Sequence, residues 1–153
     1  MPDNPEAVLA ALFAAIQTVD DDGDAEMALI DRNGATTLEV EERPAIRMWD
    51  GDEAPGNLPA RPAARKARPS FLAQPCVALY VEGVGAEAGT ALNALLARFR
   101  RAYLNNEALY AALGSDGTIS ESSLVRDLAP ADKVQANAII HLDILYQFNP
   151  QSP

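Results

Sequence analysis

Two long stretches of the chain carry apolar residues at every third or fourth position, which is the spacing of one face of an α-helix. The first stretch, Pro5 to Val19, follows Asn4, a residue type that caps helices well, and has proline at the first helical position. The second stretch runs from Thr90 to Tyr103, and Glu107 to Leu113 favours a further short helix. The pattern predicts two main amphipathic helices. Their apolar stripes comprise Val8, Leu9, Leu12, Phe13, Ile16 and Val19, and then Leu92, Leu95, Leu96, Phe99 and Tyr103.

Alternation of apolar and polar residues predicts strands around these helices. Residues 26–31 and 36–42 are predicted to form a hairpin, because Asn33-Gly34 between them is a strong turn signal. Further strands are predicted at 44–49, 71–82, 118–127 and 136–148, with a bulge or a sheet edge near Pro75. We therefore expect an α+β fold over the single domain 1–153: a mostly antiparallel, twisted sheet with two main helices packed on one face.

Residues 50–70 differ in kind from the rest of the chain. They contain four prolines, two glycines and four bases, and almost no large apolar residue. Prolines favour extended backbone, because each fixes its own φ and disfavours the α-region for the preceding residue. The pattern predicts an extended, basic, proline-rich loop of a length that is usually functional in a compact domain.

The formal net charge of the chain is −10, and it is unevenly distributed. Residues 1–42 carry eleven acids and one base, whereas residues 43–68 carry six bases and three acids. Phosphates repel an acidic chain, which argues against nucleic-acid binding as the main function. Acidic and basic regions in one chain suit contact between protein copies.

The cysteine count and the hydropathy pattern indicate the redox compartment of the chain and whether it contacts a membrane. The single cysteine, Cys76, allows no intrachain disulfide and fits a reducing compartment. No secretory signal and no apolar run of membrane-spanning length is visible, so we expect no membrane contact.

Two groups of residues invite a chemical interpretation, and each has a structural alternative. The acidic run 20–24 offers oxygen ligands for calcium, but its glycine does not fall where an EF-hand loop requires it; the alternative is a solvated turn. His141, the only histidine, shares a strand face with Asp143; it is either catalytic or a half-buried, hydrogen-bonded sheet residue. Phosphate-loop, dinucleotide and nucleophile-elbow motifs are absent. We expect a non-enzymatic protein with no metal and no cofactor.

The basic cluster of the long loop is the strongest local signal of function. It has three interpretations: an arm that lies on a neighbouring subunit, a solvated loop, and a nucleic-acid contact. We favour the arm, because the acidic residues near the N-terminus offer carboxylates that guanidinium groups pair with across interfaces. The residues predicted at subunit or partner interfaces are Arg47, Trp49, Arg61, Arg65, Lys66, Arg68, Asp20, Asp21, Asp22 and Asp24.

The order and the residue composition of these segments resemble those of a known protein family. The opening helix is followed by the strand RPAIRMWDGDE at 43–53 and the loop PARPAARKARPS at 59–70. The strand CVALYVEG at 76–83, the helix LNALLARFRRAYLN at 92–105 and the closing strand AIIHLDILYQF at 138–148 complete the pattern. Over most of its length the chain resembles the tail-terminator (minor tail or tail-completion) proteins of long-tailed phages and of gene transfer agents.

The resemblance implies a structural role. It implies helices packed on one side of a twisted sheet, and a homo-oligomeric, hexameric ring that caps the tail tube, ends its polymerisation and forms the head–tail joining surface. The implied partners are the major tail tube protein and a head-completion or stopper protein, with DNA only passing through the lumen. The implied place is the head-proximal end of the virion tail, after assembly in the host cytoplasm. The family has no catalytic residues, so the resemblance implies none at any position of this chain. Another head–tail completion or connector protein, or a small non-catalytic protein-binding domain, remains the alternative.

Overall fold

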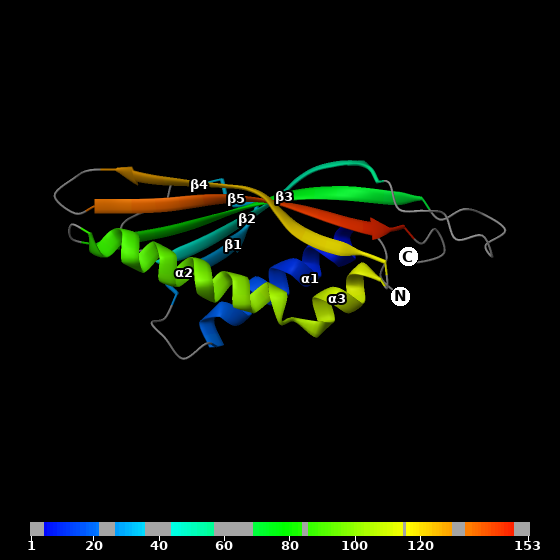
Figure 1. The fold of residues 1–153 in the computed structure, drawn as a ribbon. Helices are drawn as coiled ribbons and strands as arrows, with labels where there is room; N and C mark the ends of the chain where they lie inside the picture. The colour runs from blue at the N-terminus through cyan, green and yellow to red at the C-terminus, as the bar shows by residue number, and fades with distance from the viewer. Residues whose placement is uncertain are drawn as a thin grey trace.

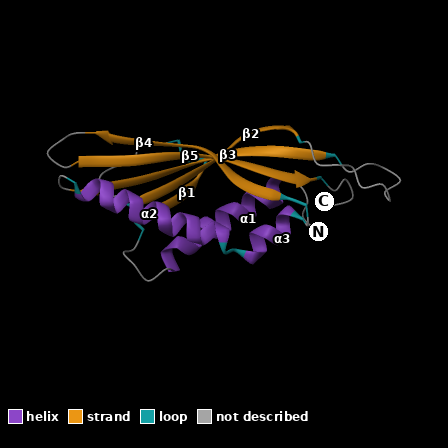
Figure 2. Ribbon diagram, in the orientation of Figure 1, coloured by secondary structure: helices purple, strands orange, loops and turns teal. Residues whose placement is uncertain are grey.

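The protein folds into one sheet covered by helices on a single face. The computed structural model describes residues 5–21, 27–35, 44–56, 69–83, 86–114, 116–129 and 134–148. Its elements are α1 (Pro5–Gln17), the 3-10 helix η1 (Thr18–Asp21), β1 (Leu29–Arg32), β2 (Ala45–Pro55), β3 (Ser70–Gly83), α2 (Glu87–Leu104), α3 (Glu107–Leu113), β4 (Thr118–Ala129) and β5 (Val134–Gln147). The described helices lie together on one side of the sheet (Figure 1), and colouring by element type shows two layers (Figure 2). The predicted α+β class is confirmed.

The two longest described strands, β3 and β5, are neighbours inside the sheet. The strand order is β1-β2-β3-β5-β4, and every neighbouring pair is antiparallel except β1 and β2. Strand β1 pairs with β2 in parallel, and the N–H of Asn33 then donates to Met48 O at 2.7 Å. The hairpin partner predicted for this strand, residues 36–42, lies outside the described residues.

Strand β2 is longer than predicted, because a bulge lets it continue past Trp49. The register against β3 shifts between Trp49 and Asp52, and Gly51 between them adopts a φ of 70°, a left-handed conformation that glycine adopts without strain. Pro75 lies opposite this shift, where proline's lack of an N–H costs no ladder bond.

The predicted loop over 50–70 is therefore wrong at both of its ends. Residues 52–55 pair with β3 as far as Pro55–Phe71, and the N–H of Gly56 donates to Ser70 O at 2.8 Å. The remainder of that loop, residues 57–68, lies outside the described residues. The described strands on either side of this twelve-residue segment, β2 and β3, are hydrogen-bonded neighbours where the described residues end.

Three α-helices of the described chain pack on the sheet, namely the two predicted main helices and the predicted short one. Helix α1 ends at Gln17, earlier than predicted, and Val19 falls in η1 but remains buried. Helix α2 begins at Glu87, three residues before the predicted start. Asn106 caps α3, because its side-chain oxygen accepts the N–H of Leu109 at 2.9 Å. The short helix predicted at 107–113 is confirmed.

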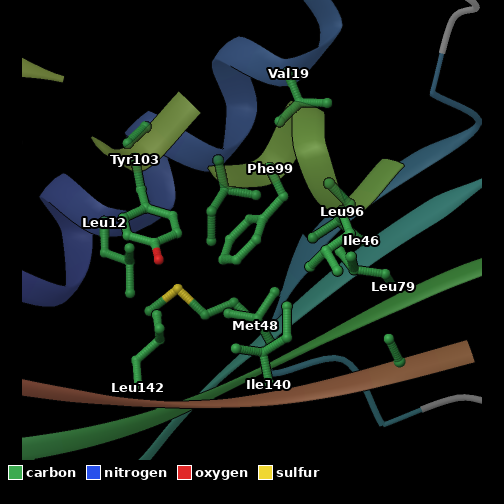
Figure 3. Close-up of a cluster of buried hydrophobic side chains, with 14 of the residues drawn as sticks. Leu12, Val19, Ile46, Met48, Leu79, Leu96, Phe99, Tyr103, Ile140 and Leu142 are labelled. Atoms are coloured by element: carbon green, nitrogen blue, oxygen red, sulfur yellow. The ribbon is translucent and has the colours of Figure 1, made fainter. Parts of the chain in front are cut away.

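The core lies between the helices and the sheet. The predicted apolar stripe of α2 is buried, and so is one alternating face of β5: Phe99, Ile140, Leu142, Ile144 and Tyr146 are all 0% exposed. Figure 3 shows the ring of Phe99 reaching from α2 toward Met48 and Ile140 of the sheet. Its centroid lies 5.0 Å from that of Tyr103, a spacing typical of favourable aromatic pairs.

Two arginines of α2 attach this helix to the rest of the domain. Arg98 lies outside the apolar stripe, yet it is buried, and its Nη2 donates to Val19 O at 2.8 Å, which satisfies a carbonyl at the end of η1. Arg100 donates through Nε and Nη2 to the two carboxylate oxygens of Glu121 on β4, at 2.9 and 2.8 Å. The hydroxyl of Tyr103 donates to the same carboxylate at 2.6 Å. Strand β4 is thereby fixed beneath α2.

Candidate functional site

The sheet face opposite the helices carries no helix of the described chain (Figure 1). Because side chains alternate along a strand, the residues of β5 between its core positions point to this side: Ile139, His141, Asp143 and Leu145. No described helix covers them (Figure 1). We call this surface the open face. Val125 of β4 and its cross-strand neighbour Ile139 are exposed there, at 60% and 38%.

Arg47 and Trp49, two of the predicted interface residues, lie on the open face near β1. Arg47 is only 5% exposed, and its Nε donates to Asp31 Oδ2 at 3.0 Å. The indole N–H of Trp49 donates to the carbonyl of Gly34 at 3.3 Å. Both side chains therefore hold the β1 edge of the sheet within the chain itself.

The acidic predicted site residues are only partly described. Asp20 and Asp21 form the end of η1, and Asp20 Oδ1 accepts the N–H of Met27 at 2.8 Å. Asp20 thus anchors the chain where it returns toward β1. Asp22 and Asp24 lie outside the described residues, as do the basic candidates Arg61, Arg65, Lys66 and Arg68.

The structure brings Cys76 and His141 together, which the sequence did not predict. The register of β3 and β5 sets these residues directly opposite each other, with Trp49 and Ser123 continuing the row on β2 and β4. Burial raises the pKa of the Cys76 thiol, so this cysteine is protonated at neutral pH. His141 is exposed, not half-buried as one interpretation required. Protonation of the thiol weakens it as a nucleophile and as a metal ligand.

Much of the positive charge on the described part of the chain is paired within the chain itself. Three described arginines form ion pairs with described carboxylates: Arg32 with Glu6 and Asp50, Arg47 with Asp31, and Arg100 with Glu121. The hydrogen bonds that Arg32 donates to Asp50 and Glu6 raise the pKa of Arg32, and the same pairing lowers the pKa of Asp50. In contrast, several surface carboxylates form no ion pair with a described residue: Asp52, Glu87, Glu107, Asp127 and Asp143. The described surface therefore presents mainly negative charge.

The open face is hollowed at the end of the sheet where β2 and β5 finish and β3 and β4 begin. The depression has a volume of about 350 Å³ and is lined by Pro55, Gly56, Leu72, Thr118, Ser120, Asp143 and Leu145. Leu72 and Leu145 are cross-strand partners, and Ser120 lies opposite Asp143 on β4. Two leucines, two hydroxyls and one carboxylate thus line one concave site.

Comparison with family models and with curated protein sequences identifies no relative. No protein-family model matches the chain, and no curated protein sequence matches it significantly. Among the described residues, no group of three or more histidine, cysteine or acidic side chains is placed to hold a metal ion. No described helix is both long and apolar enough to cross a membrane. The fold itself defines an α+β protein with helices on one sheet face and an open face on the other.

Proposed function

We propose that this chain is a structural assembly protein that forms a ring with copies of itself, in the role of a tail terminator. In this role the ring caps a tail tube, ends its polymerisation and provides the surface that joins the head. The observation that carries the proposal is a separation of charge. Residues 57–68 carry four bases and no acid, whereas the described body holds many surface carboxylates, and three of its six described arginines form ion pairs with carboxylates of the same chain.

This charge separation suits a repeating contact between identical chains. A ring requires a heterologous interface, in which two different patches of one subunit meet those of its neighbours. The basic segment is one such patch and the acidic body is the other. Because the whole chain is −10 and the segment is +4, the remaining residues carry −14. Opposite charges on the two patches favour head-to-tail contact over contact between like patches.

The length of the basic segment also supports the proposal. It joins β2 to β3, which are antiparallel neighbours up to Pro55 and Phe71. A two-residue turn is sufficient to join such strands, so most of the twelve residues are not needed for chain connection. Extra length of this kind in a compact domain is usually retained for a function.

Charge reversal in the basic segment tests the proposal. We expect the triple variant Arg61→Glu, Arg65→Glu, Arg68→Glu to be monomeric under conditions in which the parent chain forms rings, as measured by light scattering coupled to size-exclusion chromatography. The matched control replaces the same three arginines with lysine; it keeps the charge and retains most of the assembly. An unchanged particle mass for the glutamate variant would contradict the proposal. Loss of DNA binding without a change in mass would favour a nucleic-acid contact instead.

A small protein-binding domain is the second candidate, and the open face favours it. Val125 and Ile139 form an exposed apolar pair on that face, with the long edge strand β4 beside them. Uncovered edge strands and exposed apolar pairs are common features of partner-binding surfaces. Val125→Asp would weaken binding to such a partner and leave the ring mass of the chain unchanged.

A further inference from the structure

The depression on the open face combines three features that suit one kind of ligand. Leu72 and Leu145 supply apolar surface, and both are half-buried. Asp143 supplies a negative charge, and the hydroxyls of Thr118 and Ser120 supply further hydrogen-bond acceptors. A side chain with an apolar stem and a cationic end uses all three features at once.

Arginine fits this description better than the other side chains do. Its methylene groups cover apolar surface while its planar guanidinium pairs with a carboxylate and with neighbouring oxygens. An anionic or purely apolar group would leave the charge of Asp143 without a partner in a partly desolvated site, which is unfavourable.

The carboxylate of Asp143 is available for such a partner. Within the described chain it accepts one hydrogen bond, from the side-chain amide of Gln74 at 3.3 Å, and it pairs with no described cation. Asp52 of β2 lies on the other side of Gln74, in the same row across the sheet. Adjacent strands are about 4.8 Å apart, so the two carboxylates lie about 10 Å from each other across the row. A second negative charge thus reinforces the attraction of the site for cations.

We infer that the depression of one subunit receives an arginine from residues 61–68 of a neighbouring copy. This inference rests on the proposed ring and names the surface on which its basic segment docks. Charge complementarity identifies the occupant, because the segment has three arginines and one lysine while the open face offers Asp143 and Asp52. The proposed ring selects the neighbour's segment over the subunit's own, because a segment that filled its own subunit's depression would not link one copy to the next.

Reversal of one charge in the depression tests the inference directly. We expect Asp143→Lys to raise the dissociation constant of the ring by about tenfold or more, since it removes one partner of an interfacial pair and adds a like charge. The control is Asp127→Lys, which makes the same change at an exposed, unpaired carboxylate on the open face of β4, outside the depression. The control retains the ring. Circular dichroism of both variants confirms that each is folded.

A mixing experiment distinguishes docking between copies from docking within one. The Asp143→Lys chain keeps its basic segment, and the triple glutamate chain keeps its depression. At concentrations where each alone is monomeric, the mixture assembles. The basic segment of the first chain meets the unchanged depression of the second, and the glutamates of the second chain meet the introduced lysine of the first, so both contacts join opposite charges. A mixture that stays monomeric overturns docking between copies.

The outcomes also separate this inference from the proposed function. If the parent chain forms a ring and Asp143→Lys assembles equally well, the docking site is wrong and the ring stands. If the parent chain itself is monomeric, the proposed function fails, and the inference that rests on it fails too.

Discussion

The contact between α2 and edge strand β4 makes a quantitative prediction about stability and pH. Glu121 accepts two hydrogen bonds from Arg100 and one from Tyr103, and its side chain is 19% exposed. Glu121→Gln keeps the size of the side chain but removes the charge and one acceptor. Charge-assisted hydrogen bonds contribute about 1.5–3 kcal/mol. Because the Arg100 side chain is 39% exposed, solvent screening lowers this figure, and we expect a loss of about 1–2 kcal/mol.

The pH dependence follows from the direction of the pKa shift. Hydrogen bonds from Arg100, and then from Tyr103, lower the pKa of Glu121 below its ordinary value of 4.5, against the effect of burial. Above that value the carboxylate is ionised in both the folded and the unfolded chain, so its full stabilisation is present. As the pH falls below it, the unfolded chain binds the proton first, and the stabilisation is lost through the folded pKa.

Urea unfolding of the parent chain and of Glu121→Gln, at neutral pH and at about pH 3, measures this difference in free energy. We expect the two chains to differ at neutral pH and to converge in acid. The control Asp127→Asn changes an exposed carboxylate on the same strand and shifts stability by less than about 0.5 kcal/mol. A difference that is the same at both pH values would refute the reasoning, because it would not arise from the ionised carboxylate.

Three further predictions follow from burial and backbone geometry. Phe99→Ala removes a ring that is 0% exposed and lowers the free energy of unfolding by about 3–5 kcal/mol in urea titration; a loss below about 1 kcal/mol would mean that the ring is not in the core. Gly51→Ala is destabilising by at least about 1 kcal/mol, because the φ of Gly51 is +70° and a Cβ there would collide with the carbonyl of Gln74. In contrast, a Cβ at Gly89 in α2 meets no atom within 4 Å, so Gly89→Ala stabilises the chain by about 0.5–1 kcal/mol. The melting temperatures of the two variants should therefore move in opposite directions from that of the parent chain. Cys76 reacts slowly with an alkylating reagent at neutral pH, because burial raises its pKa, and denaturant accelerates the reaction; equal rates in the folded and unfolded chain would contradict this.

Local patterns in the sequence predict most of the elements but not their arrangement. The stripe of α2 and the alternation of β5 each arise from residues near one another in the chain, so their buried faces are readable in advance. The cap at Asn106 is similarly local. In contrast, the parallel pairing of β1 with β2 is fixed by contacts between segments, such as the ion pair of Asp31 with Arg47.

Strand β2 shows how tertiary pairing overrides local preference. Asp50 to Pro55 consists largely of residues that are uncommon in strands, and its composition favours a loop. In the fold, the bulge at Gly51 restores the register and pairs Asp52 to Pro55 with β3. No signal within the segment itself carries this information.

Only the basic segment of the proposed contact can be predicted from the sequence. The four bases of residues 57–68 are evident from composition alone. The depression is not, because Leu72, Thr118 and Leu145 come from three strands and meet only through the sheet register. The proximity of Cys76 and His141 was missed for the same reason.

Assembly of the intact chain into a closed ring is the central claim, and native mass spectrometry tests it most directly. The account predicts a discrete species of six times the chain mass of 16.3 kDa, which dissociates to single chains when Arg61, Arg65 and Arg68 are reversed to glutamate. Screening by added salt should weaken the ring of the parent chain in the same direction. A parent chain that remains at 16.3 kDa at every concentration and salt level tested would contradict the account.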